Sequence, residues 1–229
     1  MATARKHSAG RQVAQILPSA VRRSRSLTGF AGAGCALAFI LLGLLVRNEI
    51  PSVDRWFVDN VVVVPGSPLH QMALVLSTVT VLSCAAVLVA VALRAWWHRP
   101  RRGADLLWCV TLLLSCGLLA ALQFAFRRPG PPGQPEGFSY PSGHASVAGA
   151  FAMLAVVIAA VFVRKWLSAV LALQGGALLV TMAARVALAE HYVTDVLGAV
   201  LGVCAIGLLG GSAVKRWWVE DVPRHRDPA

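Results

Sequence analysis

Apolar residues gather into six long runs, which short polar segments separate. The runs lie at about 29–46, 71–93, 105–126, 145–163, 167–188 and 195–213. Each run is close to the ~20 residues that a helix needs to cross the ~30 Å hydrocarbon core of a bilayer. The pattern therefore predicts an all-α, integral membrane bundle of six helices. An even number of spans places both termini on one side of the membrane.

The composition favours the same class of protein. Hydrophobic residues make up 57% of the 229-residue chain, and charged residues make up 14%. A soluble domain of this length does not need so many apolar residues. The net charge of +11 could indicate nucleic-acid binding, but the basic residues flank the apolar runs and form no isolated patch. We therefore expect no nucleic-acid partner, with contact to anionic lipid as a secondary effect of this charge.

The basic residues mark four alternate segments of the chain. They precede the first run, lie between the second and third and between the fourth and fifth, and follow the sixth: Arg22, Arg23, Arg25, Arg94, Arg99, Arg101, Arg102, Arg164, Lys165, Lys215 and Arg216. The positive-inside rule makes these segments cytoplasmic. We expect a basic cytoplasmic arm at 1–27, a membrane domain at 28–213 and a cytoplasmic tail at 214–229. The expected location is a bacterial plasma membrane.

Two polar clusters fall in connections that would then face outward. The first is the turn-rich stretch 138–144, which ends in His144 and opens straight into the fourth run. The second extends from Arg185 through His191 to Asp195. The start of a helix attracts anions, because its first N–H groups are free and carry the positive end of the helix dipole. Since both clusters lie at one face of the membrane, we expect them to hold a phosphate between them.

The residue types in these clusters suit chemistry on a phosphate. His191 and Asp195 are four residues apart, so the carboxylate could orient one ring nitrogen and leave the other free to attack. A simple ion pair at a helix start is the alternative. His144 could give a proton to a leaving oxygen. Ser142 and Gly143 could offer a hydroxyl and backbone N–H groups to phosphate oxygens, although Ser142 also fits a helix N-cap.

Arginines extend the candidate site. The planar fork of Arg185 suits a phosphate. Arg127 and Arg128 lead into a proline-rich loop that could aim one of them at the same place, and snorkelling at the interface is the alternative for this pair. The five cysteines lie within apolar runs, and neither they nor the histidines have zinc-site spacing. We expect no metal and no cofactor.

With these residues in place, the chain resembles the type-2 phosphatidic acid phosphatase superfamily of membrane lipid phosphatases, which shares a fold with vanadium haloperoxidases. The family pattern is Lys-x6-Arg-Pro, then Pro-Ser-Gly-His, then Ser-Arg-x5-His-x3-Asp. The second motif is present at 141–144. The third is present with Ala184 in place of its serine. The first lacks its lysine: one register puts Ala121 there and aligns Arg128-Pro129, and the other puts Gln123 there and Gly130 at the arginine.

The resemblance implies an active site at the extracytoplasmic face and a two-step, metal-independent hydrolysis. His191 would attack phosphorus, Asp195 would orient it, and His144 would protonate the leaving group and then activate water. The phosphate would be bound by Arg185, Ser142, Gly143, Arg128, Arg127 and Gln123. The substrate would be a lipid phosphate in the membrane: polyprenyl phosphate or diphosphate, phosphatidic acid, phosphatidylglycerol phosphate or a cell-wall lipid intermediate.

Two other functions fit the same residues. A lipid phosphotransferase could use the same site and pass the phosphoryl group to another acceptor. A non-catalytic scaffold could bind a lipid phosphate, which the missing lysine and serine would permit. The sequence also leaves open whether the protein forms a homo-oligomer.

Overall fold

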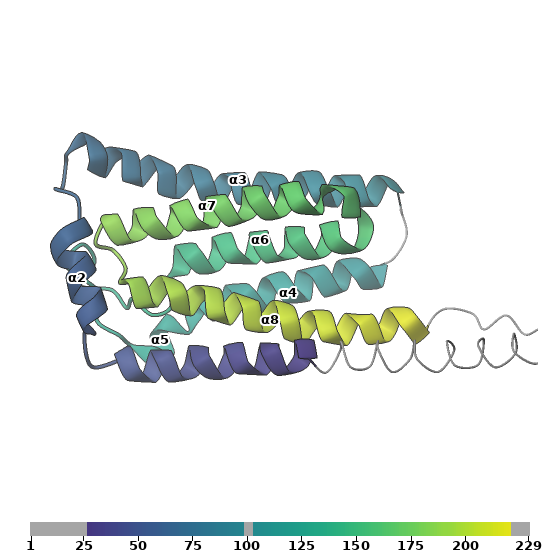
Figure 1. Cartoon of the computed structure of the whole chain (residues 1–229), viewed down its shortest axis with the longest axis horizontal. Coiled ribbons are helices and arrows are strands. Elements are labelled where there is room, and N and C mark those ends of the chain that lie inside the picture. The colour runs from purple at the N-terminus through teal and green to yellow at the C-terminus, as the bar shows by residue number, and fades with distance from the viewer. Residues whose placement is uncertain (1–26, 99–102, 221–229) are drawn as a thin grey trace, which may run out of the picture.

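Long helices lie side by side along the long axis of the molecule (Figure 1). The computed structural model describes residues 27–98 and 103–220. Within these ranges, six helices are long and apolar enough to cross a membrane: Leu27–Val46, Pro68–Trp97, Leu107–Phe126, Gly143–Phe162, Arg164–Ala187 and Val193–Gly211. Each coincides with one predicted run to within a few residues. The predicted all-α bundle is confirmed.

The helices after the first span have well-defined bounds. The long ones are α3 (Pro68–His98), α4 (Gly103–Ala121), α6 (Gly143–Phe162), α7 (Leu167–Ala187) and α8 (Val193–Glu220). The short ones are α2 (Ser52–Val61), α5 (Gln123–Phe126) and the 3-10 helix η1 (Arg164–Trp166). The helix α8 continues past the expected boundary at 213. Residues 1–26 of the expected arm and 221–229 of the expected tail lie outside the described part.

Helix α6 is the centre of the bundle, and it contacts α3, α4, α7 and α8. Its buried positions are mostly small residues: Ala145, Ala148, Gly149, Ala150, Ala152, Ala155 and Ala159. Small side chains let helix backbones approach closely, and in lipid this packing replaces the hydrophobic effect as the main attraction between helices. The sequence of α6 therefore explains why four other helices can pack around it.

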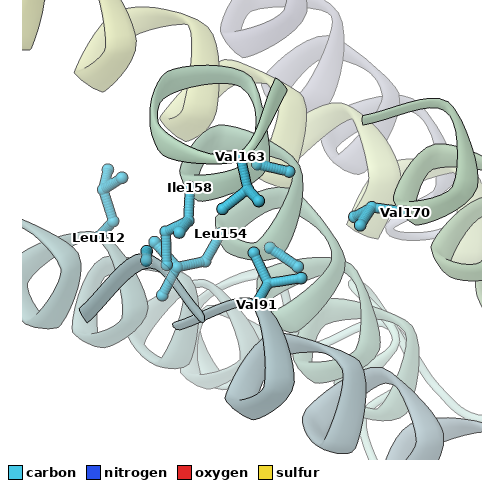
Figure 2. Close-up of a cluster of buried hydrophobic side chains, with 9 residues drawn as sticks. Val91, Leu112, Leu154, Ile158, Val163 and Val170 are labelled. Atoms are coloured by element: carbon cyan, nitrogen blue, oxygen red, sulfur yellow. The ribbon is translucent and has the colours of Figure 1, made fainter. Parts of the chain in front are cut away.

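Larger apolar side chains fill the core at the end of the bundle where α6 turns into α7. Figure 2 shows Val91 of α3, Leu112 of α4 and Leu154 and Ile158 of α6 grouped there, with Val170 of α7. Large apolar residues also cover the outside of the bundle, as at Leu45 and Leu114, whose exposed fractions are 74% and 68%. Such a surface suits hydrocarbon tails and not water.

Helix α2 lies across the opposite end of the bundle from the α6–α7 turn (Figure 1). It belongs to the connection 47–70, which the charge pattern predicts to face outward. Its far end is tied to α7, because the Val63 N–H donates to the Ala187 carbonyl at 2.9 Å. This placement brings a residue of α2 into contact with the segments that carry the two polar clusters.

Candidate active site

The two polar clusters meet at the α2 end of the bundle. The Ser142 N–H donates to the Asp195 carbonyl at 3.2 Å, and the Gly133 N–H donates to the Ala189 carbonyl at 2.9 Å. These bonds join the loop before α6 to the loop between α7 and α8. The structure therefore brings together the segments that the sequence predicts to share a site.

His191 is buried, with 4% of its surface exposed. Its Nδ1 lies 3.0 Å from the Ser139 carbonyl oxygen. Because a carbonyl only accepts, Nδ1 carries the proton in this hydrogen bond, and Nε2 of the neutral ring is left unprotonated. The loop backbone thus selects the tautomer that suits attack by Nε2.

Asp195 does not make the hydrogen bond to His191 that the spacing suggests. Its Oδ2 lies 3.8 Å from His191 Nδ1, beyond hydrogen-bond distance. Helix α8 begins at Val193, so His191 precedes the helix and the two residues do not share a helical face. The Asp195 oxygens are taken by other donors: Oδ2 accepts from the Tyr192 N–H at 2.8 Å, and Oδ1 accepts from Arg128 at 2.5 Å.

Arg128 is at the centre of a buried charge network. Its Nη1 donates to Asp195 Oδ1 and to Thr194 Oγ1 at 2.5 and 2.7 Å, and its Nη2 donates to Asp54 Oδ2 at 2.7 Å. The exposed fractions of Arg128, Asp54 and Asp195 are 1%, 0% and 0%. The expectation for Arg128 was a phosphate contact, whereas the structure pairs its guanidinium with two carboxylates and covers it.

The ring of Tyr192 completes the cover of Arg128. The guanidinium carbon lies 4.2 Å from the ring centroid, a cation–π geometry. Burial raises the pKa of the Tyr192 phenol, so this ring stays neutral beside the network. A buried cation with two carboxylates is tolerated only when further donors satisfy the spare oxygens, and Thr194 and the Tyr192 N–H supply these donors.

Arg185 is the cation that the site leaves available to a ligand. It is in the last turn of α7 and pairs with Glu190, the residue before His191. Among the described residues, its buried Nε has no hydrogen-bond partner. A buried donor without an acceptor is costly, so this guanidinium is suited to an additional anion.

The start of α6 contributes further residues to the candidate site. Ser142 is its N-cap, and the Ser142 hydroxyl oxygen accepts from the Ala145 N–H at 3.4 Å, so the capping role is realised. A Cβ added at Gly143 would meet no atom within 4 Å, so the space beside this first helical residue is open. His144 is exposed, and Arg185 and His191 are near enough to act on it electrostatically. The two histidines and Arg185 are thus close to one another.

Two expected phosphate-binding residues are not drawn into this group. Arg127 is exposed, adopts a left-handed conformation with φ 52°, and donates from Nε to the Phe124 carbonyl at 3.2 Å. Gln123 is half-buried at the start of α5, and its carbonyl accepts from the Arg127 N–H at 2.9 Å. Both residues serve the end of the third span.

Tyr140 anchors the loop before α6 to the bundle. Burial raises the pKa of its phenol, and the hydroxyl donates to the Phe39 carbonyl of the first span at 2.5 Å. Its ring packs against Phe39 and Phe126 at centroid distances of 5.5 and 4.9 Å. The loop that carries Ser142 and His144 is thereby fixed to a helix that itself carries no site residue.

Sequence reasoning misses Asp54, Thr194 and Ser139. Asp54 lies outside the two polar clusters and the family motifs, although it is the acidic residue in the first turn of an amphipathic stretch. Thr194 lies within the third motif, between His191 and Asp195, at a position that the motif leaves open. Ser139 acts through its backbone carbonyl, for which a side-chain pattern has no signal. No three His, Cys, Asp or Glu side chains of residues 27–98 and 103–220 are grouped as a metal site.

Comparisons with known proteins bear on the family and on the fold. The family model of the PAP2 superfamily matches residues 124–218, which contain both complete polar clusters. A comparison with curated proteins gives no match. Among solved structures, the chain is similar to the first transmembrane PAP2 type phosphatidylglycerolphosphate phosphatase from Bacillus subtilis, with 23% identity, a TM-score of 0.60, and coverage of 86% of this chain and 100% of that one. That neighbour supports the membrane-spanning fold, and this chain is an integral membrane protein. The part of the chain that carries both polar clusters, residues 124–218, thus matches the PAP2 superfamily, and the fold of the chain is similar to that of a transmembrane PAP2 protein.

Proposed function

We propose that this protein is a membrane lipid phosphatase that hydrolyses a phosphate monoester or diphosphate of a lipid without a metal. Its family supports phosphatase activity on a phosphate ester. The observation that carries the proposal is the arrangement of His191, whose Nδ1 is engaged by the Ser139 carbonyl while Nε2 is left for attack. Arg185 supports it with a buried Nε that needs an acceptor.

The reaction would proceed in two displacements. In the first, His191 Nε2 forms a bond to phosphorus and the P–O bond to the lipid breaks, while His144 gives a proton to the leaving oxygen. In the second, water attacks the phosphohistidine, the P–N bond breaks, and His144 takes the proton of the water. Arg185 and the N–H groups at the start of α6 would stabilise the charge on the phosphoryl oxygens. Asp195, held in place by Arg128, would stabilise His191 electrostatically across the 3.8 Å between Oδ2 and Nδ1.

The test is phosphate release by the purified full-length chain in mixed micelles. The panel contains phosphatidic acid, phosphatidylglycerol phosphate, polyprenyl phosphate and polyprenyl diphosphate, each with and without EDTA. We expect release that EDTA leaves unchanged. His191→Ala is expected to fall to background, and His144→Ala to lose about 10²–10⁴-fold, the usual contribution of a general acid. His70→Ala is the matched control, because His70 lies at the same end of the bundle and outside the site.

Full release by His191→Ala from every lipid in the panel would contradict the proposal. The phosphotransferase alternative predicts a phosphorylated product only when an acceptor lipid is added, so the products are analysed with and without one. The scaffold alternative predicts binding of lipid phosphate with no release by the wild type. An acid-labile, alkali-stable phosphate label on the wild type that is missing from His191→Ala would identify the intermediate.

A further inference from the structure

The start of α8 depends on a residue from another helix. The first N–H groups of any helix have no partner within the helix and need one from outside. The Thr194 N–H, at the second position of α8, donates to Asp54 Oδ1 at 3.1 Å, and the Thr194 hydroxyl donates to Asp54 Oδ2 at 2.6 Å. Asp54 is 140 residues away in the sequence, in the first turn of α2. Its carboxylate therefore does for α8 what a local N-cap residue usually does.

The same carboxylate also fixes Arg128. Arg128 donates from Nη2 to Asp54 and from Nη1 to Asp195, so the guanidinium bridges the two acids. Without the negative charge of Asp54, Nη2 would lose its charged acceptor in a place that water does not reach, and Asp195 would lose the support of a correctly held Arg128. Asp54 itself is fully buried, so it acts on the site through Arg128 and Thr194 and is not accessible to a ligand.

We propose that Asp54 of α2 is a positioning residue for the reaction: it caps α8 from outside and, through Arg128, holds Asp195 and the loop with His191 in place against α6. The inference rests on the proposed function for its kinetic consequence. It assigns α2 a task in the site, although α2 carries none of the family motifs and lies outside the matched range 124–218. An error of about 1 Å in the place of a reacting group can cost about 10²-fold in rate.

The kinetic test compares Asp54→Asn with Asp59→Asn. Both changes remove one carboxylate from α2, but Asp59 is exposed and Asp54 is buried. We expect Asp54→Asn to lower kcat per folded molecule by about 10–100-fold with KM within about twofold, because the substrate does not touch Asp54. Asp59→Asn is expected to match the wild type. Asp54→Glu, which restores the charge, is expected to recover part of the loss.

A purely structural role would have a different signature. It would lower the yield and the unfolding temperature of Asp54→Asn while each folded molecule kept the wild-type kcat, and that result would overturn the inference. An equal loss in Asp59→Asn would also overturn it. Should Asp54→Asn not fold, Thr194→Val serves instead, since it removes the hydroxyl that joins Asp54 to Arg128 and leaves every charge in place; wild-type kcat in that variant would sink the idea.

Hydrogen–deuterium exchange tests the placement without any substrate. We expect the peptide 191–196 to exchange faster in Asp54→Asn than in the wild type and in Asp59→Asn. Equal exchange in all three would reject the inference. A wild type that releases no phosphate from any lipid would refute the proposed function, and the exchange result alone would then decide whether Asp54 holds the start of α8.

Discussion

Arg185 and Arg128 show how two arginines of one site acquire different tasks. Arg128 has its donors taken by Asp54, Asp195 and Thr194 and is 1% exposed. Arg185 keeps a buried Nε without a partner in the described part of the chain and lies close to His144. Because a charge-assisted hydrogen bond contributes about 1.5–3 kcal/mol, the Arg185 fork should matter beyond its charge.

Arg185→Lys tests this at the scale of a single residue. Lysine keeps the positive charge but has neither the planar fork nor the Nε donor. We expect kcat/KM for the best lipid phosphate to fall about 10–100-fold, which corresponds to one lost hydrogen bond of that strength. Arg164→Lys, at the opposite end of the bundle, is the control and should keep the wild-type value. A kcat/KM within threefold of the wild type in Arg185→Lys would show that charge alone binds the phosphate.

At the scale of the helices, the side chain of Tyr140 helps to position the loop that carries Ser142 and His144. The ring of Tyr140 is held between the first span and α8, so closely that a Cβ at Gly198 would lie 2.3 Å from it and one at Gly43 would lie 2.6 Å from it. The ring cannot easily move aside, because its hydroxyl is bonded to Phe39 and Phe126 covers its edge. At Gly198, α8 thus packs closely against a side chain and not against another helix backbone.

Gly198→Ala tests this contact at the scale of the element. We expect it to destabilise the folded protein by about 1–3 kcal/mol, the usual cost of overpacking. Activity should fall with it, since Tyr140 precedes the loop of Ser142 and His144. The measurement is thermal unfolding in detergent, alongside phosphate release. Gly175→Ala is the matched control, because no atom lies within 4 Å of its added Cβ, and a comparable loss of stability there would mean that any added methyl group weakens these helices.

Across the whole molecule, the site and the basic connection η1 lie at opposite ends of the bundle. The loop with Glu136 adjoins the site, whereas η1, with Arg164 and Lys165, joins α6 to α7 at the other end (Figure 1). The positive-inside rule assigns η1 to the cytoplasm. The site should then face outward, which is the expectation for a lipid phosphate of the outer leaflet.

Single cysteines test this orientation. In a variant without its native cysteines, Glu136→Cys should react with a membrane-impermeant maleimide in intact cells, since Glu136 is exposed in the loop that adjoins the site. Lys165→Cys, also exposed, should react only after permeabilisation. The reverse labelling would place the site on the cytoplasmic side and would change the substrate pool that it reaches.

Sequence alone is enough to predict the six spans, the bundle and the residues of the two polar clusters. It could do so because a bilayer of fixed thickness demands apolar helices of fixed length, and because phosphate chemistry demands histidines and arginines at characteristic spacing. The sequence predicts His144, His191 and Arg185 to be neighbours for the same reason, because both clusters end at one face.

The tertiary structure was needed to show which buried donor meets which acceptor. In place of the expected phosphate contact, Arg128 bridges Asp54 and Asp195. These two acids lie 74 and 67 residues away from Arg128 in the sequence. The tertiary structure also gives His191 the Ser139 carbonyl in place of Asp195. A polar group that is buried away from water needs a hydrogen-bond partner within the protein. Which partner it finds depends on how α2, α6 and α8 are placed relative to one another. A local sequence pattern does not contain this information.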